Sequence, residues 1–196
     1  MAMAVSLAQK KAALFAASLL PLAYIVYLIA AQQLGIDPVK TLVHLTGDWA
    51  IRFLLVTFSI TPLRQWLKQP SLLRYRRMLG LFAWFYTSVH FLLVLTYIFG
   101  WDWELTKIEL TERPYVIVGF LAWLLMVPMG LTSNNYAVRR LRQNWRRLHL
   151  LMYPVILLGW LHIAWQARSS YFDAFLYGSI IVVLFLPRLK KLFKSR

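Results

Sequence analysis

Cysteine is absent from this chain of 196 residues. That absence excludes disulfide bonds, thiolate-bound zinc, cysteine-ligated iron–sulfur clusters and thiol nucleophiles. Acidic residues are also scarce, with seven Asp and Glu against 22 Lys and Arg. Charged residues of both signs make up only 15% of the chain, whereas a soluble domain usually has about 25%. The composition therefore argues against a soluble globular protein.

Hydrophobic residues account for 60% of the chain and form long stretches. A membrane core about 30 Å thick needs roughly 20 apolar residues in a helix. Six stretches fit, the last two only narrowly: about 12–31, 40–63, 78–99, 114–133, 148–166 and 172–188. Asp37 and Pro38 give the second stretch a typical helix start. We therefore predict an all-α integral membrane protein, a six-transmembrane-helix bundle that forms one domain over residues 1–196.

The basic residues predict how this bundle is oriented. Seventeen of the 22 lie in the N-terminal segment, the 64–77 loop, the 134–147 loop and the C-terminal tail, which the six spans place on one side. By the positive-inside rule this side is the cytoplasm, so we expect both termini there. The net charge of +15 then reflects topology and attraction to anionic membrane lipid, and not nucleic-acid binding. The first apolar stretch is longer than the hydrophobic part of a signal peptide, and we interpret it as a retained span.

All the histidines of the chain, His44, His90, His149 and His162, lie within or at the edge of predicted spans. Ionisable residues inside a membrane are costly and are candidates for function by default. His90 and His162 are each expected roughly 20 Å from the cytoplasmic side, at a rise of 1.5 Å per residue. Two imidazoles at one depth on different helices can clamp a haem by its axial faces. Membrane histidines also serve as packing or proton-relay groups, so their positions alone leave this choice open.

Two further details bear on these histidines. Thirteen residues of regular helix leave His149 and His162 roughly 140° apart around the axis, so a shared face requires a distortion. Pro154 and Gly159, which lie between them, can supply it. On the second span, Arg52 follows Asp48 by four residues, which predicts either an intramembrane ion pair or a contact of Arg52 with a haem propionate.

Several segments resemble the ferric-reductase-like transmembrane family, and the resemblance runs nearly end to end. They are GIDPVKTLVHLTGDWAIRFLL at 35–55, ITPLR at 60–64, RRMLGLFAWFYTSVH at 76–90, TERPYVIVGFLAW at 111–123, LTS at 131–133 and NWRRLHLLMYPVILLGWLHIAW at 144–165. The resemblance implies that His90, His149 and His162 bind haem b as iron ligands, and that FMN is a second cofactor. It leaves His44 as a possible additional ligand or a contact to quinone or haem.

The resemblance also implies a biological setting, the bacterial inner membrane. Electrons would come from the quinone pool or a flavin reductase and pass to a periplasmic molybdopterin-containing methionine sulfoxide reductase, which repairs oxidised periplasmic proteins. The chain would then be a redox subunit without catalytic residues, with catalysis in the partner. Two other functions stay open from the residues alone, a small proton-coupled transporter and a membrane assembly factor without haem. The absence of an inverted repeat argues against the transporter.

The cytoplasmic side lacks a fourth histidine that could complete a second haem site. The positions about 13 residues before His90 are Arg76 and Arg77, which can pair with propionates but do not ligate iron. His149 is therefore either a haem ligand or part of a flavin or quinone site. The loop arginines are candidates for contact with a flavin phosphate or an electron donor, with topology and lipid binding as the alternative: Arg74, Arg76, Arg77, Arg139, Arg140 and Arg142.

The 100–113 loop is expected on the periplasmic face and is acidic. Four acids, Asp102, Glu104, Glu109 and Glu112, stand there against two bases. Because opposite charges speed the encounter of two proteins, we predict that these acids dock the periplasmic partner. The alternative is that an outer loop is acidic only because the inner loops are basic.

Overall fold

The computed structural model describes residues 6–167 and 170–194, and within these ranges it is helical apart from short connections. The helices are α1 (Leu7–Ala30), α2 (Pro38–Trp66), α3 (Leu73–Tyr97), α4 (Trp103–Glu112), α5 (Pro114–Leu131), α6 (Asn135–Leu141), α7 (Gln143–Leu148), α8 (Met152–Gln166) and α9 (Phe172–Lys194). Two 3₁₀ turns, η1 (Pro70–Leu72) and η2 (His149–Leu151), precede α3 and α8. The prediction of an all-α protein is confirmed for these residues.

Four helical segments in the described ranges are long and apolar enough to cross a membrane: Leu7–Ala30, Pro70–Tyr97, Pro114–Leu131 and Gln143–Gln166. The segment Phe172–Pro187 forms a shorter apolar helix. Helix α2 falls outside this set because polar residues, His44, Asp48 and Arg52 among them, interrupt its apolar sequence. A helical membrane protein is thus confirmed, whereas six membrane crossings remain a prediction.

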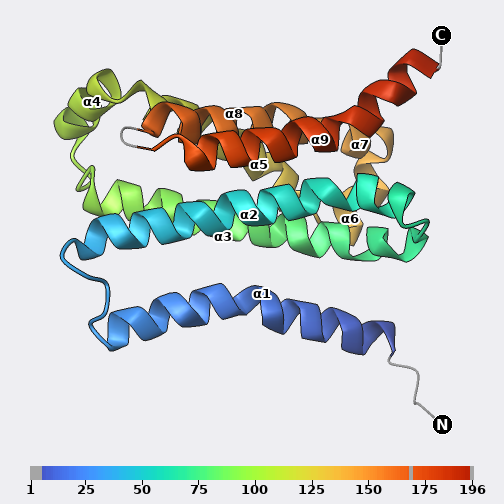
Figure 1. Ribbon diagram of the computed structural model, residues 1–196, viewed down its shortest axis with the longest axis horizontal. Coiled ribbons are helices and arrows are strands. Elements are labelled where there is room, and N and C mark those ends of the chain that lie inside the picture. Colours follow the sequence, from blue (N-terminus) through green and yellow to red (C-terminus); the bar gives the residue numbers. More distant parts are fainter. Residues whose placement is uncertain (1–5, 168–169, 195–196) are drawn as a thin grey trace.

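The long helices run side by side, with the α2–α3 pair in the middle (Figure 1). Helix α2 packs most extensively on α3, and α5 packs on α8, while α9 contacts α8 and α2. Helix α1 lies along the other side of this pair and touches it at few points. The helix pairs α2–α3 and α5–α8 are therefore the two units between which a site can form.

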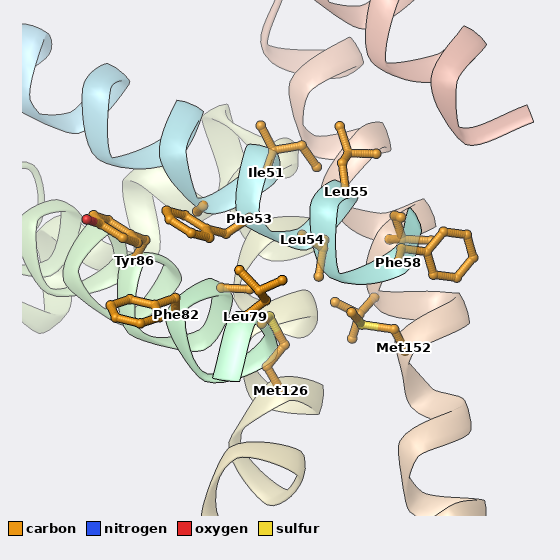
Figure 2. Close-up of a cluster of buried hydrophobic side chains, with 14 of the residues drawn as sticks. Ile51, Phe53, Leu54, Leu55, Phe58, Leu79, Phe82, Tyr86, Met126 and Met152 are labelled. Carbon is orange, nitrogen blue, oxygen red and sulfur yellow. The ribbon is translucent and has the colours of Figure 1, made fainter. Parts of the chain in front are cut away.

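Buried side chains of α2, α3, α5, α8 and α9 form the core, part of which Figure 2 shows. Phe53 of α2 stacks on Tyr86 of α3, with ring centres 5.0 Å apart and an angle of 6° between the planes. Offset aromatic pairs of this kind add about 0.5–1.5 kcal/mol beyond the burial of their area. The Tyr86 hydroxyl donates to the Ser18 carbonyl at 2.8 Å and accepts from the Leu22 N–H at 3.2 Å, so it joins α1 to this core.

Two local features refine the sequence-based picture. Helix α4 forms inside the 100–113 loop, where Asp102 caps it by accepting hydrogen bonds from the N–H groups of Glu104 and Leu105. The expected irregularity between the two histidines of the fifth stretch occurs at its start, in the 3₁₀ turn η2. Pro154 explains this position, because it has no N–H to donate to the carbonyl of the preceding turn. The irregular turn therefore begins at His149 itself.

Candidate functional site

The imidazoles of His90 on α3 and His162 on α8 lie next to each other. Their ring centres are 6.3 Å apart and their planes are nearly perpendicular, at 80°. The two histidines for which the sequence predicts one depth on different helices are thus brought together. Neither histidine belongs to the hydrophobic core cluster, and each residue is partly exposed on the surface of the protein. The pair forms the centre of the candidate site.

Each ring is held by a backbone carbonyl of a neighbouring helix. Nδ1 of His90 lies 3.0 Å from the Val43 carbonyl oxygen of α2, and Nδ1 of His162 lies 2.7 Å from the Tyr115 carbonyl oxygen of α5. A carbonyl oxygen can only accept, so Nδ1 carries the proton in both rings. In a neutral imidazole the lone pair is then on Nε2. This is the arrangement in which a histidine serves as a metal ligand.

A glycine makes room for each ring. Gly47 stands four residues after Val43 on α2, and a β-carbon there would lie 3.1 Å from Cε1 of His90. Gly119 stands four residues after Tyr115 on α5, and a β-carbon there would lie 2.7 Å from Nδ1 of His162. The two helix pairs therefore share one arrangement. A backbone carbonyl accepts from the histidine, and a glycine one turn later leaves space for its ring. Sequence reasoning missed both glycines because their role depends on which helices cross.

The separation of the two rings fits a shared metal ion. With ring bonds of about 1.33 Å, the centre of an imidazole lies about 1.1 Å from each nitrogen. With metal–nitrogen bonds of about 2.0 Å, two imidazoles on opposite sides of one ion would have their centres about 6.2 Å apart, close to the 6.3 Å observed. The described residues contain no group of three or more His, Cys, Asp or Glu that could hold a bare ion. Two axial imidazoles instead suit an iron whose other positions are filled by a macrocycle.

A second feature is a cavity of about 290 Å³ beside His149, between α2, α3, α5 and α8. Nδ1 of His149 lies 2.9 Å from the Trp145 carbonyl oxygen, and its ring stacks on the Trp145 ring at 3.8 Å. Its Nε2 is thereby also left as an acceptor or ligand. Other lining residues are Arg76, Arg77, Trp84, Met126, Met129 and Met152. Among the described residues, His149 is the one histidine that lines this cavity.

Two hydrogen-bond donors of the described part of the chain lie at this cavity, on Trp84 and Arg76. The buried Nε1 of Trp84 has no acceptor among the described residues, and Arg76 takes part in no ion pair with them. A buried N–H without an acceptor costs roughly 1–3 kcal/mol, so such groups call for an explanation. The cavity thus offers one acceptor, His149, and two donors to a ligand that carries carbonyl or carboxylate oxygens.

The other predicted site residues lie apart from these two centres. His44 is the exception, because it directly follows Val43, whose carbonyl holds His90, although its side chain is exposed on α2. Arg52 forms an ion pair with Asp48 at 3.2 Å, with its guanidinium over the Trp49 ring. Arg74 lies outside the His149 cavity, as do three exposed arginines at or just after α6, Arg139, Arg140 and Arg142. Of the two outcomes predicted for Arg52, the described structure contains the ion pair.

Helix α4 and the residues around it contain the four acids predicted to dock a partner. Glu104 pairs with Lys107 at 2.8 Å, and Glu109 pairs with Arg113 at 3.0 Å, although poor alignment leaves the second pair without a hydrogen bond. The Glu109 side chain is only 14% exposed. Asp102 is occupied as the cap of α4. Glu112 is exposed and forms no ion pair with a described residue, so it is the acid best placed to meet another protein.

The fold defines a class, the helical membrane proteins, and the paired imidazoles give this one a candidate metal site. The chain belongs to the ferric reductase like transmembrane component family, which matches residues 46–160. Among its relatives is the protein-methionine-sulfoxide reductase heme-binding subunit MsrQ of Xanthomonas oryzae, which is 44% identical over 89% of this chain and 83% of that protein. The proteins of the same name from Xanthomonas campestris and Polaromonas naphthalenivorans are 43% and 37% identical, over 98% and 89% of this chain and 91% and 81% of theirs. No solved structure matches the chain.

Proposed function

We propose that this protein is the haem-binding subunit of a methionine sulfoxide reductase system and carries electrons through the bacterial inner membrane to a periplasmic partner. The observation that carries the proposal is the pair His90 and His162, with ring centres 6.3 Å apart and both Nδ1 atoms engaged by backbone carbonyls. The names of the relatives, heme-binding subunits of a methionine sulfoxide reductase, support it independently. Catalysis would then take place in the partner.

His90 and His162 would hold a b-type haem through its iron. Bound there, the haem would supply a one-electron couple of its iron inside the membrane. The chain would contribute neutral ligands, which bring no charge into the apolar core. The carbonyls of Val43 and Tyr115 would hold the two rings and keep the proton on Nδ1. Two imidazole nitrogens as the protein's ligands to the iron would favour electron transfer over oxygen chemistry.

The proposal includes a topology of six membrane crossings within a single domain. Helix α2 and the described apolar part of α9 lie beside the four segments that meet the length and hydropathy of a span. The basic loops would face the cytoplasm, together with both termini. In this orientation the His149 cavity lies on the cytoplasmic side, and α4 lies on the periplasmic side.

Electrons would enter at the His149 cavity. The Trp84 N–H, which has no acceptor among the described residues, and the Arg76 guanidinium, which forms no ion pair with them, can donate hydrogen bonds to the carbonyl oxygens of a redox ring, and Nε2 of His149 can accept its proton. A quinone or a flavin such as FMN has such oxygens. Arg76 and Arg77 could equally receive the propionates of a haem. The single histidine among the described lining residues favours a donor site over a second bis-histidine haem.

A spectrum of the purified full-length protein tests the function. We expect a b-type haem at about one per chain, with a Soret band that shifts on reduction and low-spin signals typical of two nitrogen ligands. Replacing His90 or His162 by Ala is expected to remove most of this haem while the protein still inserts into the membrane. A colourless wild-type protein would instead favour a transporter or an assembly factor. Full haem content in both single variants would show that His90 and His162 do not bind one haem together.

A further inference from the structure

We propose that a basic groove between the N-terminal ends of α1 and α3 binds an anionic phospholipid of the cytoplasmic leaflet. The groove has a volume of about 400 Å³. Its wall consists of three cations, Lys11, Arg74 and Arg77, and three apolar residues, Leu73, Met78 and Leu81. It is separate from the paired imidazoles, and the inference depends on the membrane location alone and not on haem.

The three cations converge without a negative charge of the described residues nearby. The ion pairs among the described residues involve the acids Asp48, Glu104 and Glu109. None of these acids lines the groove. In the sequence no acidic residue occurs before Asp37 or between Asp48 and Asp102. Cations that share a groove repel one another, so a ligand with negative charge gains from all three at once. A phosphate group is the membrane component that meets this requirement.

Arg77 is oriented by the protein itself. Its guanidinium donates to the Asn135 side-chain oxygen at 2.7 Å, which fixes one side of the group. A guanidinium has five N–H donors, so others remain available for phosphate oxygens. Because fewer rotamers are lost when an already oriented side chain binds, this contact lowers the entropic cost of holding a headgroup. Surface arginines that attract lipid only by charge lack such an anchor.

The apolar half of the groove matches the acyl part of a lipid. Met78 and Leu81 follow the cations along α3 toward the membrane interior, and further on Phe82 meets Phe15 of α1 with ring centres 5.2 Å apart. Phe15 is 50% exposed, and α1 contacts α3 at few points, so the seam is open to chains from the side. Free phosphate would use the cations but leave this wall uncovered. The combination selects an amphiphile.

A comparison of two triple variants tests the site. The groove variant carries Lys11→Gln, Arg74→Gln and Arg77→Gln, and the control carries Arg139→Gln, Arg140→Gln and Arg142→Gln. Both remove three positive charges, but the control residues are exposed and line neither cavity. Phosphatidylglycerol is titrated onto the full-length protein in neutral detergent, and bound lipid is counted by native mass spectrometry. Each cation near an anionic surface is worth about five-fold in affinity, so the groove variant should bind roughly a hundred-fold more weakly, and the control should bind nearly as wild type.

Several outcomes would overturn the site. Equal losses in the two triple variants would reduce the binding to general surface attraction. Phosphatidylcholine that binds as tightly as phosphatidylglycerol would remove the role of negative charge. Displacement of the lipid by millimolar inorganic phosphate would make the groove a free-phosphate site. If the groove variant fails to insert, Arg74→Gln alone should weaken phosphatidylglycerol about five-fold while Arg74→Lys should bind as wild type, and equal binding by Arg74→Gln and wild type would refute the proposal.

Discussion

The ring of His162 leaves no room for a side chain on Gly119. A β-carbon at this position would come within 2.7 Å of Nδ1, the atom that the Tyr115 carbonyl already holds at 2.7 Å. The ring would have to move, and its distance from the ring of His90 would change. The spacing of the histidine pair therefore depends on a residue that carries no functional group.

Gly119→Ala is expected to weaken haem binding about 10–100-fold, the usual cost of disturbing a group that orients a metal ligand. The measurement is haem retained per chain, together with the low-spin electron paramagnetic resonance signal. Gly159→Ala is the matched control, because its β-carbon would meet Ile51 and Leu54 at 3.6 Å, an ordinary contact. If the Gly119→Ala variant keeps the haem content and spectrum of the control, Gly119 does not position the ligand.

His149→Ala is expected to leave the haem of His90 and His162 in place but to slow its reduction about a hundred-fold, the lower end of what one proton-transfer group contributes to a reaction. The physical reason is that the alanine cannot accept a proton from a donor in the cavity. Stopped-flow reduction of the purified protein by a soluble hydroquinone measures the rate. Arg147→Gln, an exposed change that lines no part of the cavity, serves as the control. Loss of the haem band in the His149 variant would instead identify this residue as an iron ligand.

Tyr86→Phe is expected to loosen α1 from α3 and to lower the free energy of unfolding by about 1 kcal/mol. The change removes the hydrogen bonds to the Ser18 carbonyl and from the Leu22 N–H but keeps the ring that stacks on Phe53. Unfolding in sodium dodecyl sulfate, followed by circular dichroism, provides the measurement. Tyr24→Phe, on α1 itself, is a suitable control because Tyr24 is 53% exposed. Equal stability of the two variants would mean that the hydroxyl does not anchor α1.

Glu112→Gln is expected to slow haem oxidation by the periplasmic partner more than Glu104→Gln does. Glu112 forms no ion pair with a described residue, whereas Lys107 already neutralises Glu104 at 2.8 Å. Stopped-flow oxidation at low ionic strength should reveal the difference, and added salt should erase it, because screening shortens the reach of exposed charges to about 8 Å at 0.15 M. Identical rates for both variants at every salt concentration would leave these acids as markers of topology only.

The histidine pair shows how much of the site the sequence contains. Counting residues from the cytoplasmic loops places His90 and His162 at one depth, because helical rise is nearly constant. The same counting cannot reveal which neighbouring helix accepts from each ring, since a crossing point depends on side chains from two distant segments. Val43, Gly47, Tyr115 and Gly119 therefore emerged only from the structure.

The fold follows the same division. Long apolar stretches predict the long helices, because burial in lipid needs little more than length and hydrophobicity. The sequence predicts a loop where helix α4 forms, because the mixed charges there give no apolar helix face. The Asp102 cap and two ion pairs support the helix instead. The sequence predicts a distortion between His149 and His162 with Pro154 and Gly159 as its sources; the irregular turn lies at His149–Leu151, because a proline disturbs the turn that precedes it.

The carbonyl contacts of the two histidines have a consequence for how this site withstands change over generations. Whatever residue replaces Val43 or Tyr115, the main chain still offers the same carbonyl oxygen. The acceptor therefore depends on the helix and not on the side chain at that position. Substitutions of the two histidines, or of the two glycines that make room for their rings, should therefore damage the site most. A deep mutational scan should therefore find four intolerant positions within the membrane. The surrounding helix positions should tolerate substitution as long as the new residue is apolar.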